Sequence, residues 1–172
     1  MSAVSKAKDI LTKEQLAALG EIAVESAHLE GTVDRMIRVV LRIEPDEFDI
    51  LIGSRMLGRK IDVLKTCGLV RLAGKKRKRR RYRFTVLMDR IKQLISQRAI
   101  AIHGDWGPEG GISLGDLMAG KWVPGTAEAK LKKSAMKSGE LEKLADAFNE
   151  ADIELWKFAG ENWLFRAMKT HP

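Results

Sequence analysis

The stretch that decides the fold is FTVLMDRIKQLISQRAIAIH, residues 84–103. Its apolar residues recur at helical spacing and, at about 100° per residue, form one stripe: Phe84, Leu87, Met88, Ile91, Leu94, Ile95 and Ile102. This spacing predicts an amphipathic helix over 84–102. Arg98 falls inside the apolar stripe, between Leu94 and Ile102, and His103 follows directly before Gly104, where the helix is expected to end.

A guanidinium inside an apolar stripe needs an explanation. Burying it costs several kcal/mol unless a carboxylate, a phosphate or a cluster of acceptors meets it. Asp152 is the first candidate partner, because it interrupts the apolar face of the last predicted helix. Glu25 and Glu30, which flank the stripe of the first helix, are alternatives.

Helices are predicted on both sides of this stretch. Thr12 with Gln15 three residues later predicts a capping box, and Pro45 ends that first helix near Ile43. A helical turn is expected over 46–52. A second short helix is expected from about Met56 to Cys67 and is closed by Gly68, and a last amphipathic helix begins at Ser138 or Gly139.

The stretch 104–125 differs in composition, since it is rich in glycine and holds two tryptophans. It predicts a small hairpin, with arms over 114–118 and 121–123. The expected fold is therefore all-α: a bundle of four to five helices with a small β-hairpin insertion before the last helix. We expect residues 1–11 to be a flexible N-terminus and 12–168 to be a single domain.

Composition narrows the class of protein. The chain has 172 residues, of which 45% are hydrophobic and 6% aromatic, as is typical of a helical globular domain. The single cysteine, Cys67, excludes an internal disulfide and favours a reducing, cytoplasmic environment. We expect no membrane segment and no signal peptide. The three histidines are far apart, so neither a metal site nor a cofactor is expected.

The positive net charge of +8 comes from one short run between residues 75 and 83. Leaving its eight cations out of the 31 basic residues leaves 23, which equals the number of acidic residues. The connection over 69–83 is either a loop or a two-stranded excursion, and charge repulsion favours a basic loop. Clustered cations favour RNA or another nucleic acid as partner, with Tyr82 available for base stacking, whereas the alternative is a merely solvated loop. The run consists of Lys75, Lys76, Arg77, Lys78, Arg79, Arg80, Arg81 and Arg83.

Arg98 and His103 together suit cleavage of an RNA phosphodiester without a metal. The imidazole can move protons near neutral pH, and the guanidinium can hold phosphoryl oxygens as negative charge develops on them. Asp105 could orient the imidazole, and Asp152 could orient either group. The alternative is structural: Arg98 forms an ion pair, and His103 caps the carboxyl end of its helix.

The order of these parts resembles that of HEPN-like helical domains. The resemblance covers roughly residues 15–165 and rests on a long first helix, a Gly53-Ser54 segment with short helices, and a helix that ends in Arg98…His103-Gly104-Asp105-Trp106. It implies an all-α, usually homodimeric bundle whose Arg-x4–6-His pattern lines a cleft between two copies. Active members are metal-independent endoribonucleases, and many relate to toxins or defence.

In terms of this chain, the resemblance implies that Arg98 takes the arginine role and His103 the general acid–base role. A cognate antitoxin then becomes a candidate partner. Ala99 departs from the family pattern, because many active members carry a polar residue, commonly Asn, directly after the arginine. Two alternatives stay open: a non-catalytic HEPN-like domain that binds nucleic acid through 75–83, and a dimeric interaction module.

Overall fold

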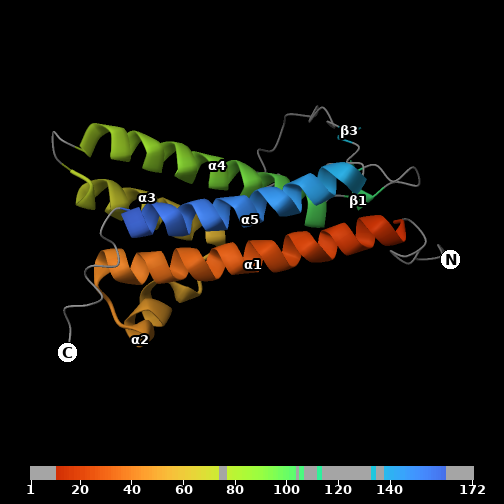
Figure 1. Cartoon of the computed structure of the whole chain (residues 1–172). Coiled ribbons are helices and arrows are strands. Elements are labelled where there is room, and N and C mark those ends of the chain that lie inside the picture. Colours follow the sequence, from red (N-terminus) through yellow and green to blue (C-terminus); the bar gives the residue numbers. More distant parts are fainter. Residues whose placement is uncertain are drawn as a thin grey trace, which may run out of the picture.

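The computed structural model describes residues 11–73, 77–103, 105–106, 112–113, 133–134 and 138–161. In these residues the chain is mainly helical, which confirms the all-α class, and Figure 1 shows the helices in order. The elements are α1 (Lys13–Leu41), α2 (Pro45–Phe48), the π-helical turn η2 (Asp49–Gly53), α3 (Leu57–Arg71), α4 (Lys78–His103) and α5 (Ser138–Glu161).

Both ends of α1 follow from local chemistry. The backbone N–H of Gln15 donates to the Thr12 hydroxyl at 3.2 Å, and the backbone N–H of Thr12 donates to Oε1 of Gln15 at 2.9 Å. These two hydrogen bonds confirm the capping box. At the other end Arg42 takes the left-handed conformation, with φ of 60°. Its amide then donates to the Arg38 carbonyl at 2.7 Å and closes the helix.

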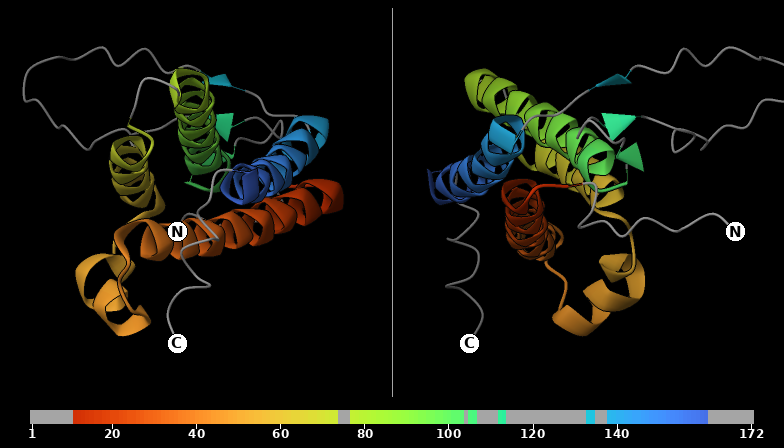
Figure 2. Two further views of the ribbon diagram at one scale, coloured as in Figure 1. Left: turned by 60° about the vertical axis from the view of Figure 1, so that its left-hand side comes forward. Right: turned by 90° about the vertical axis from the view of Figure 1, so that its right-hand side faces the viewer.

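The four long helices form a square bundle with α1 and α4 at opposite corners (Figures 1 and 2). Helices α3 and α5 lie between them and contact both. The Arg71 guanidinium donates to the Val40 carbonyl, so α1 and α3 end side by side. Arg90 of α4 reaches both Glu150 and Glu154 of α5, and those two helices run in opposite directions.

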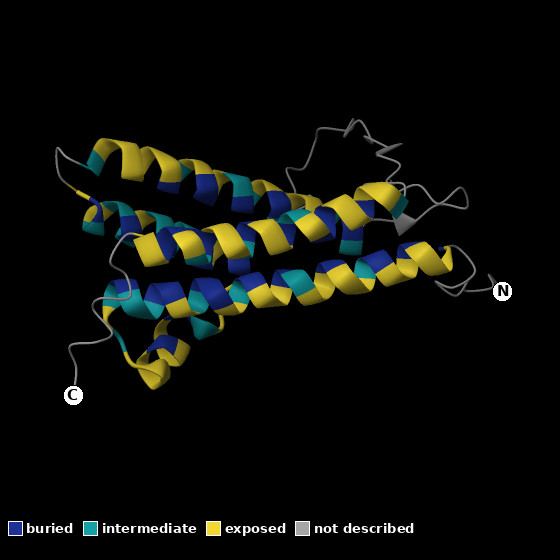
Figure 3. Cartoon of the chain, viewed as in Figure 1, coloured by how far each residue is buried: buried dark blue, intermediate teal, exposed yellow. Residues whose placement is uncertain are grey.

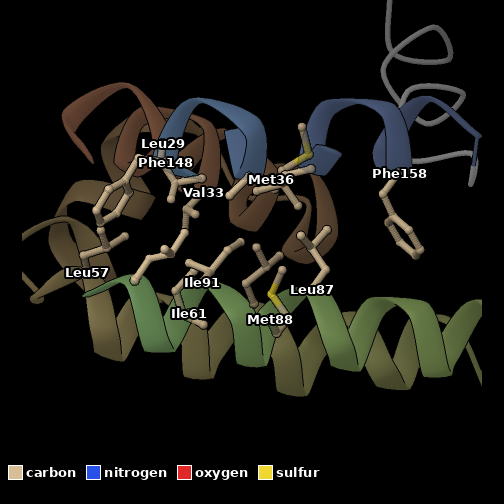
Figure 4. Packing of buried hydrophobic residues seen from close by; sticks show 14 of the residues in the cluster. Leu29, Val33, Met36, Leu57, Ile61, Leu87, Met88, Ile91, Phe148 and Phe158 are labelled. Carbon is tan, nitrogen blue, oxygen red and sulfur yellow. The ribbon is translucent and has the colours of Figure 1, made fainter. Parts of the chain in front are cut away.

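The core lies where the four helices face one another. Figure 4 shows Leu29, Ile61, Met88 and Phe148 pointing into one shared interior from α1, α3, α4 and α5. Each of these side chains is fully buried. The exposed residues lie on the outer faces of the bundle (Figure 3), as the helical periodicity predicts. This packing holds α4 in place along its whole apolar stripe.

Helix α3 does not end at Gly68, contrary to expectation, but continues to Arg71. The glycine serves close packing rather than termination. A β-carbon added at Gly68 would lie 2.5 Å from Cε1 of Phe84, which is buried and stacks on Phe158. The absence of a side chain therefore lets α4 approach α3 closely.

The expectation of a basic loop over 69–83 is also wrong at both of its ends. Helix α3 occupies 69–71, and α4 begins at Lys78, so the cations from 78 onward are helical. Repulsion among them is outweighed by the burial of Phe84, Leu87 and Met88 one turn further on, because these residues anchor the same helix to the core.

Three two-residue strands precede α5: β1 (Asp105–Trp106), β2 (Ile112–Ser113) and β3 (Lys133–Ser134). They pair antiparallel in the order β1-β2-β3. These short pairings do not establish the predicted hairpin, because its expected arms at 114–118 and 121–123 lie outside the described residues, as do 1–10 and 162–168. In the described part of the chain, no helix is long and apolar enough to cross a bilayer.

Candidate functional site

From Lys78 onward, the basic run forms the start of α4. Its first four helical residues, which we call the basic turn, are all exposed, and in the described part of the chain none of them forms an ion pair: Lys78, Arg79, Arg80 and Arg81. Arg83 differs, since it pairs with Glu161 at 3.1 Å. Arg77 donates to the Arg71 carbonyl at 3.0 Å. Lys75 and Lys76 lie outside the described residues.

The basic turn is an unfavourable arrangement for an isolated helix. The amino end of a helix already carries partial positive charge from its free N–H groups, so cations there repel that end and one another. An anion that binds there would reduce both repulsions, the one between the cations and the helix end and the one among the cations. Tyr82 directly follows the turn and is 72% exposed. The surface therefore offers several positive charges beside an accessible aromatic ring.

Arg98 lies where the helical spacing placed it. It is half-buried on the core side of α4, and its Nε is buried without a hydrogen-bond partner. A buried guanidinium nitrogen left without an acceptor costs free energy, in the range of about 1–3 kcal/mol for an unsatisfied polar group. The structure thus confirms that Arg98 lies in the apolar stripe, but the described residues provide no acceptor for its Nε.

The expected ion pair between Arg98 and Asp152 is not formed. Arg90 of α4 binds both Glu150 and Glu154 of α5. Asp152 lies between these two acids in the sequence, so it lies at the same height in the bundle as Arg90. Arg98 lies eight residues further along α4, or about 12 Å at about 1.5 Å per residue. Asp152 has its own buried Oδ1 without a partner.

The two alternative partners of Arg98 are engaged elsewhere. Glu25 lies 3.7 Å from His28, and Glu30 binds Lys60 at 2.8 Å. The register of α4 against α5 could not be read from one-dimensional spacing, because a helical wheel gives the face of a residue but not its level in the bundle.

His103 is the last residue of α4 and is exposed. Five helical steps separate it from Arg98, so the two side chains leave the helix about 140° apart. They do not share one line on a single copy of α4. Asp105 lies in β1, two residues after His103, and its side chain falls outside the described part.

A buried charge cluster joins α1 to α3, and sequence reasoning missed it. The Lys60 ammonium is almost fully buried and donates to Glu30 Oε1 and Asp34 Oδ2, both at 2.8 Å. It also lies 5.9 Å from the centre of the Phe48 ring, which ties α2 to the same cluster. The signal was available, because Lys60 interrupts the Leu57, Ile61, Leu64 stripe as Arg98 interrupts its own.

The cluster holds two carboxylates for one ammonium. Burial raises the pKa of Asp34 above its ordinary value, and the hydrogen bond from Lys60 only partly offsets this. Burial alone would lower the pKa of Lys60, but its hydrogen bonds to Asp34 and Glu30 outweigh burial and raise it. Lys60 is 3% exposed and therefore out of reach of a macromolecular ligand, so we assign the cluster a structural role.

The described residues contain no group of three or more His, Cys, Asp or Glu side chains placed to hold a metal ion. Comparisons with protein-family models, with curated proteins and with solved structures found no match for this chain.

Proposed function

We propose that this protein binds nucleic acid through the basic turn of α4. The observation that carries the proposal is that Lys78, Arg79, Arg80 and Arg81 are consecutive, exposed and without an ion pair among the described residues. Surface cations in folded proteins are commonly interspersed with acids, and elsewhere in this chain cations such as Lys65 and Arg90 do pair with acids. Four uncompensated cations at the positive end of a helix favour a polyanion.

The physical basis is the release of counterions from phosphates. Each phosphate that a lysine or arginine neutralises frees a condensed counterion, so affinity depends steeply on salt and not on sequence. Tyr82 adds a ring face on which an unpaired base can stack, a contact worth about 1–3 kcal/mol. The proposed ligand is RNA or another nucleic acid, bound chiefly through its backbone.

The test is fluorescence anisotropy with a labelled RNA of about 20 nucleotides, long enough to span the site of a small binding module. A basic-turn variant changes residues 78–81 to Gln. A matched control removes four exposed cations that have no ion pair in the described residues: Lys13, Arg59, Lys143 and Lys157. We expect the basic-turn variant to lose at least about tenfold in affinity and the control to lose much less. Equal losses would show only a general charge effect and would refute the proposal.

A second candidate function is metal-independent RNA cleavage, and the observation that favours it is the state of Arg98. Its Nε is buried without an acceptor, and the exposed His103 ends the same helix. Arg98 as a whole is only half-buried, so we propose that the outer part of its guanidinium meets a phosphate oxygen. Following the HEPN resemblance, the 2′-hydroxyl of RNA gives its proton to His103 and attacks the adjacent phosphorus, while Arg98 stabilises the developing charge. The bond from phosphorus to the 5′-oxygen breaks, and the leaving 5′-oxygen takes a proton from a protonated His103, which leaves a 2′,3′-cyclic phosphate.

This candidate needs two copies of α4, because Arg98 and His103 diverge on one helix. A homodimer in which Arg98 of one copy approaches His103 of the other would bring them to one phosphate. The toxin or defence role, and a cognate antitoxin, belong to this same proposal. Cleavage is measured with EDTA present, and the product is analysed for a 2′,3′-cyclic phosphate.

His103→Ala should abolish cleavage, whereas His28→Ala, which removes another exposed histidine, should not. If wild-type protein leaves every tested RNA intact, or if the two histidine variants behave alike, the catalytic candidate falls. Nucleic-acid binding by the basic turn would be unaffected by that result.

A further inference from the structure

The segment between α1 and α3 projects from the bundle and combines two unusual surfaces (Figures 1 and 2). We call residues 44–51, which cover α2 and the start of η2, the acidic arm. Phe48 is buried and anchors the arm to the bundle. Beyond that anchor, Ile50 is 82% exposed and Leu51 is 58% exposed. Neighbouring apolar side chains left in water on a projecting element are typical of a contact surface.

The acids of the arm have no ion pair in the described part of the chain. They are Glu44, Asp46, Glu47 and Asp49, all exposed. The Glu47 carboxylate accepts a hydrogen bond from the Glu44 amide at 2.9 Å, which fixes the first turn of the arm. The surface therefore presents four uncompensated negative charges beside Ile50 and Leu51.

The basic turn of α4 is the chemical complement of the arm. It holds four cations without an ion pair in the described residues, and it lies beside exposed apolar groups, since Tyr82 is 72% and Val86 48% exposed. Within one copy, α1 and α3 lie between the two surfaces, as the views in Figures 1 and 2 agree. The arm therefore does not cover the basic turn of its own chain.

We propose that the acidic arm docks on the basic turn of a second copy of this chain. Both surfaces lie at the same end of the bundle: the arm follows the end of α1, α4 follows the end of α3, and Arg71 bonds Val40 where these two helices end. Two copies that meet at this end can each place an arm on the partner's basic turn. Such a reciprocal arrangement closes as a two-fold dimer rather than growing into a fibre.

This docking makes nucleic acid and the second copy competitors, because both occupy the basic turn. The consequence for regulation rests on the proposed function, but the docking itself does not. Self-association is measured on protein freed of nucleic acid, so it can be present even if nucleic-acid binding fails, and absent even if nucleic-acid binding is found.

The test uses sedimentation equilibrium at low salt on two charge-reversal variants of the full chain. One variant carries Asp46→Lys and Asp49→Lys in the arm, which leaves the Glu47 hydrogen bond in place, and the other carries Arg79→Glu and Arg80→Glu in the basic turn. All four positions are exposed, so circular dichroism and Tm should match wild type within a few degrees. We expect wild type to dimerise and each variant to weaken dimerisation by at least about tenfold, since the changed surface then has no net charge and like charges meet at the changed positions.

An equimolar mixture of the two variants is the decisive sample. In the mixed pair one contact is fully native, and in the other contact the changed positions again carry opposite charges on the two surfaces, so association should return while each variant alone stays weak. The control Glu142→Arg with Asp146→Arg changes the net charge to the same extent as the arm variant, on exposed positions of α5, and should dimerise as wild type does. A monomeric wild type, a dimer unaffected by both variants, or a mixture that fails to associate would each overturn the proposal.

Discussion

Replacing Gly68 with alanine tests the closest contact between α3 and α4. The added β-carbon would lie 2.5 Å from Cε1 and 2.6 Å from Cζ of Phe84. Ordinary carbon contacts lie at about 3.5–4.0 Å, so the ring must move by about 1 Å. It has little room, because Phe84 is 2% exposed and its ring centre lies 5.2 Å from that of Phe158.

The expected magnitude is the difference of two terms. Alanine gains about 1 kcal/mol over glycine inside a helix. Overpacking a closed core costs about 1–3 kcal/mol. We therefore expect Gly68→Ala to destabilise the protein by about 1 kcal/mol. Gly31→Ala in α1 is the matched control, because a β-carbon there meets nothing within 4 Å and only the favourable term remains.

The assay is urea unfolding followed by circular dichroism. Gly31→Ala should raise the free energy of unfolding and Gly68→Ala should lower it, with a difference of about 2 kcal/mol, or about 4–8 °C in Tm for a chain of this size. In a double-mutant cycle, Phe84→Leu should cost less in the Gly68→Ala background than in wild type. If Gly68→Ala stabilised the chain as much as Gly31→Ala, the close-packing account of this glycine would be refuted.

Three further predictions concern stability. Lys60→Met should destabilise the protein by about 2–4 kcal/mol in urea unfolding, because two carboxylates lose their ammonium partner, and Asp34→Asn in the same background should recover part of the loss; no loss would contradict a stabilising cluster. The pKa of Lys60 is raised in the folded state, so the charged Lys60 stabilises the fold fully below its ordinary pKa of 10.5, and this stabilisation is lost as pH rises through the folded pKa. The free energy of unfolding of wild type should therefore fall more steeply in strong alkali than that of Lys60→Met. Parallel curves of unfolding free energy against pH would argue against this. Arg42→Gly should stabilise by about 0.5–1 kcal/mol, because glycine adopts a φ of 60° without strain, and a lower Tm would contradict this.

Much of the fold followed from the sequence because periodicity and capping are local. The stripe of α4 and the Thr12 capping box are confirmed. The helix end predicted at Gly68 and the loop predicted for the basic run were wrong for the same physical reason. A glycine can end a helix or admit a neighbouring ring, and clustered cations favour a loop only until burial of Phe84 and the residues after it outweighs their repulsion. Both outcomes depend on tertiary contacts.

For the candidate site, the sequence allowed the face of Arg98 to be predicted but not its neighbours in the bundle. The stripe placed Arg98 toward the core correctly, and its buried Nε confirms this. Its pairing with Asp152 was wrong, because the register between α4 and α5 separates them by about 12 Å at about 1.5 Å per residue. The Lys60 cluster was missed, although the same reasoning about a cation in an apolar stripe would have found it.

The central claim is that the basic turn neutralises phosphates, and the salt dependence of RNA affinity tests it most directly. Four contacts to a single strand predict a slope of log K against log salt of about −3, and the variant with residues 78–81 changed to Gln should lose most of that slope. The control lacking Lys13, Arg59, Lys143 and Lys157 should keep it. An unchanged slope in the basic-turn variant, or no binding of RNA by wild type at low salt, would contradict the account.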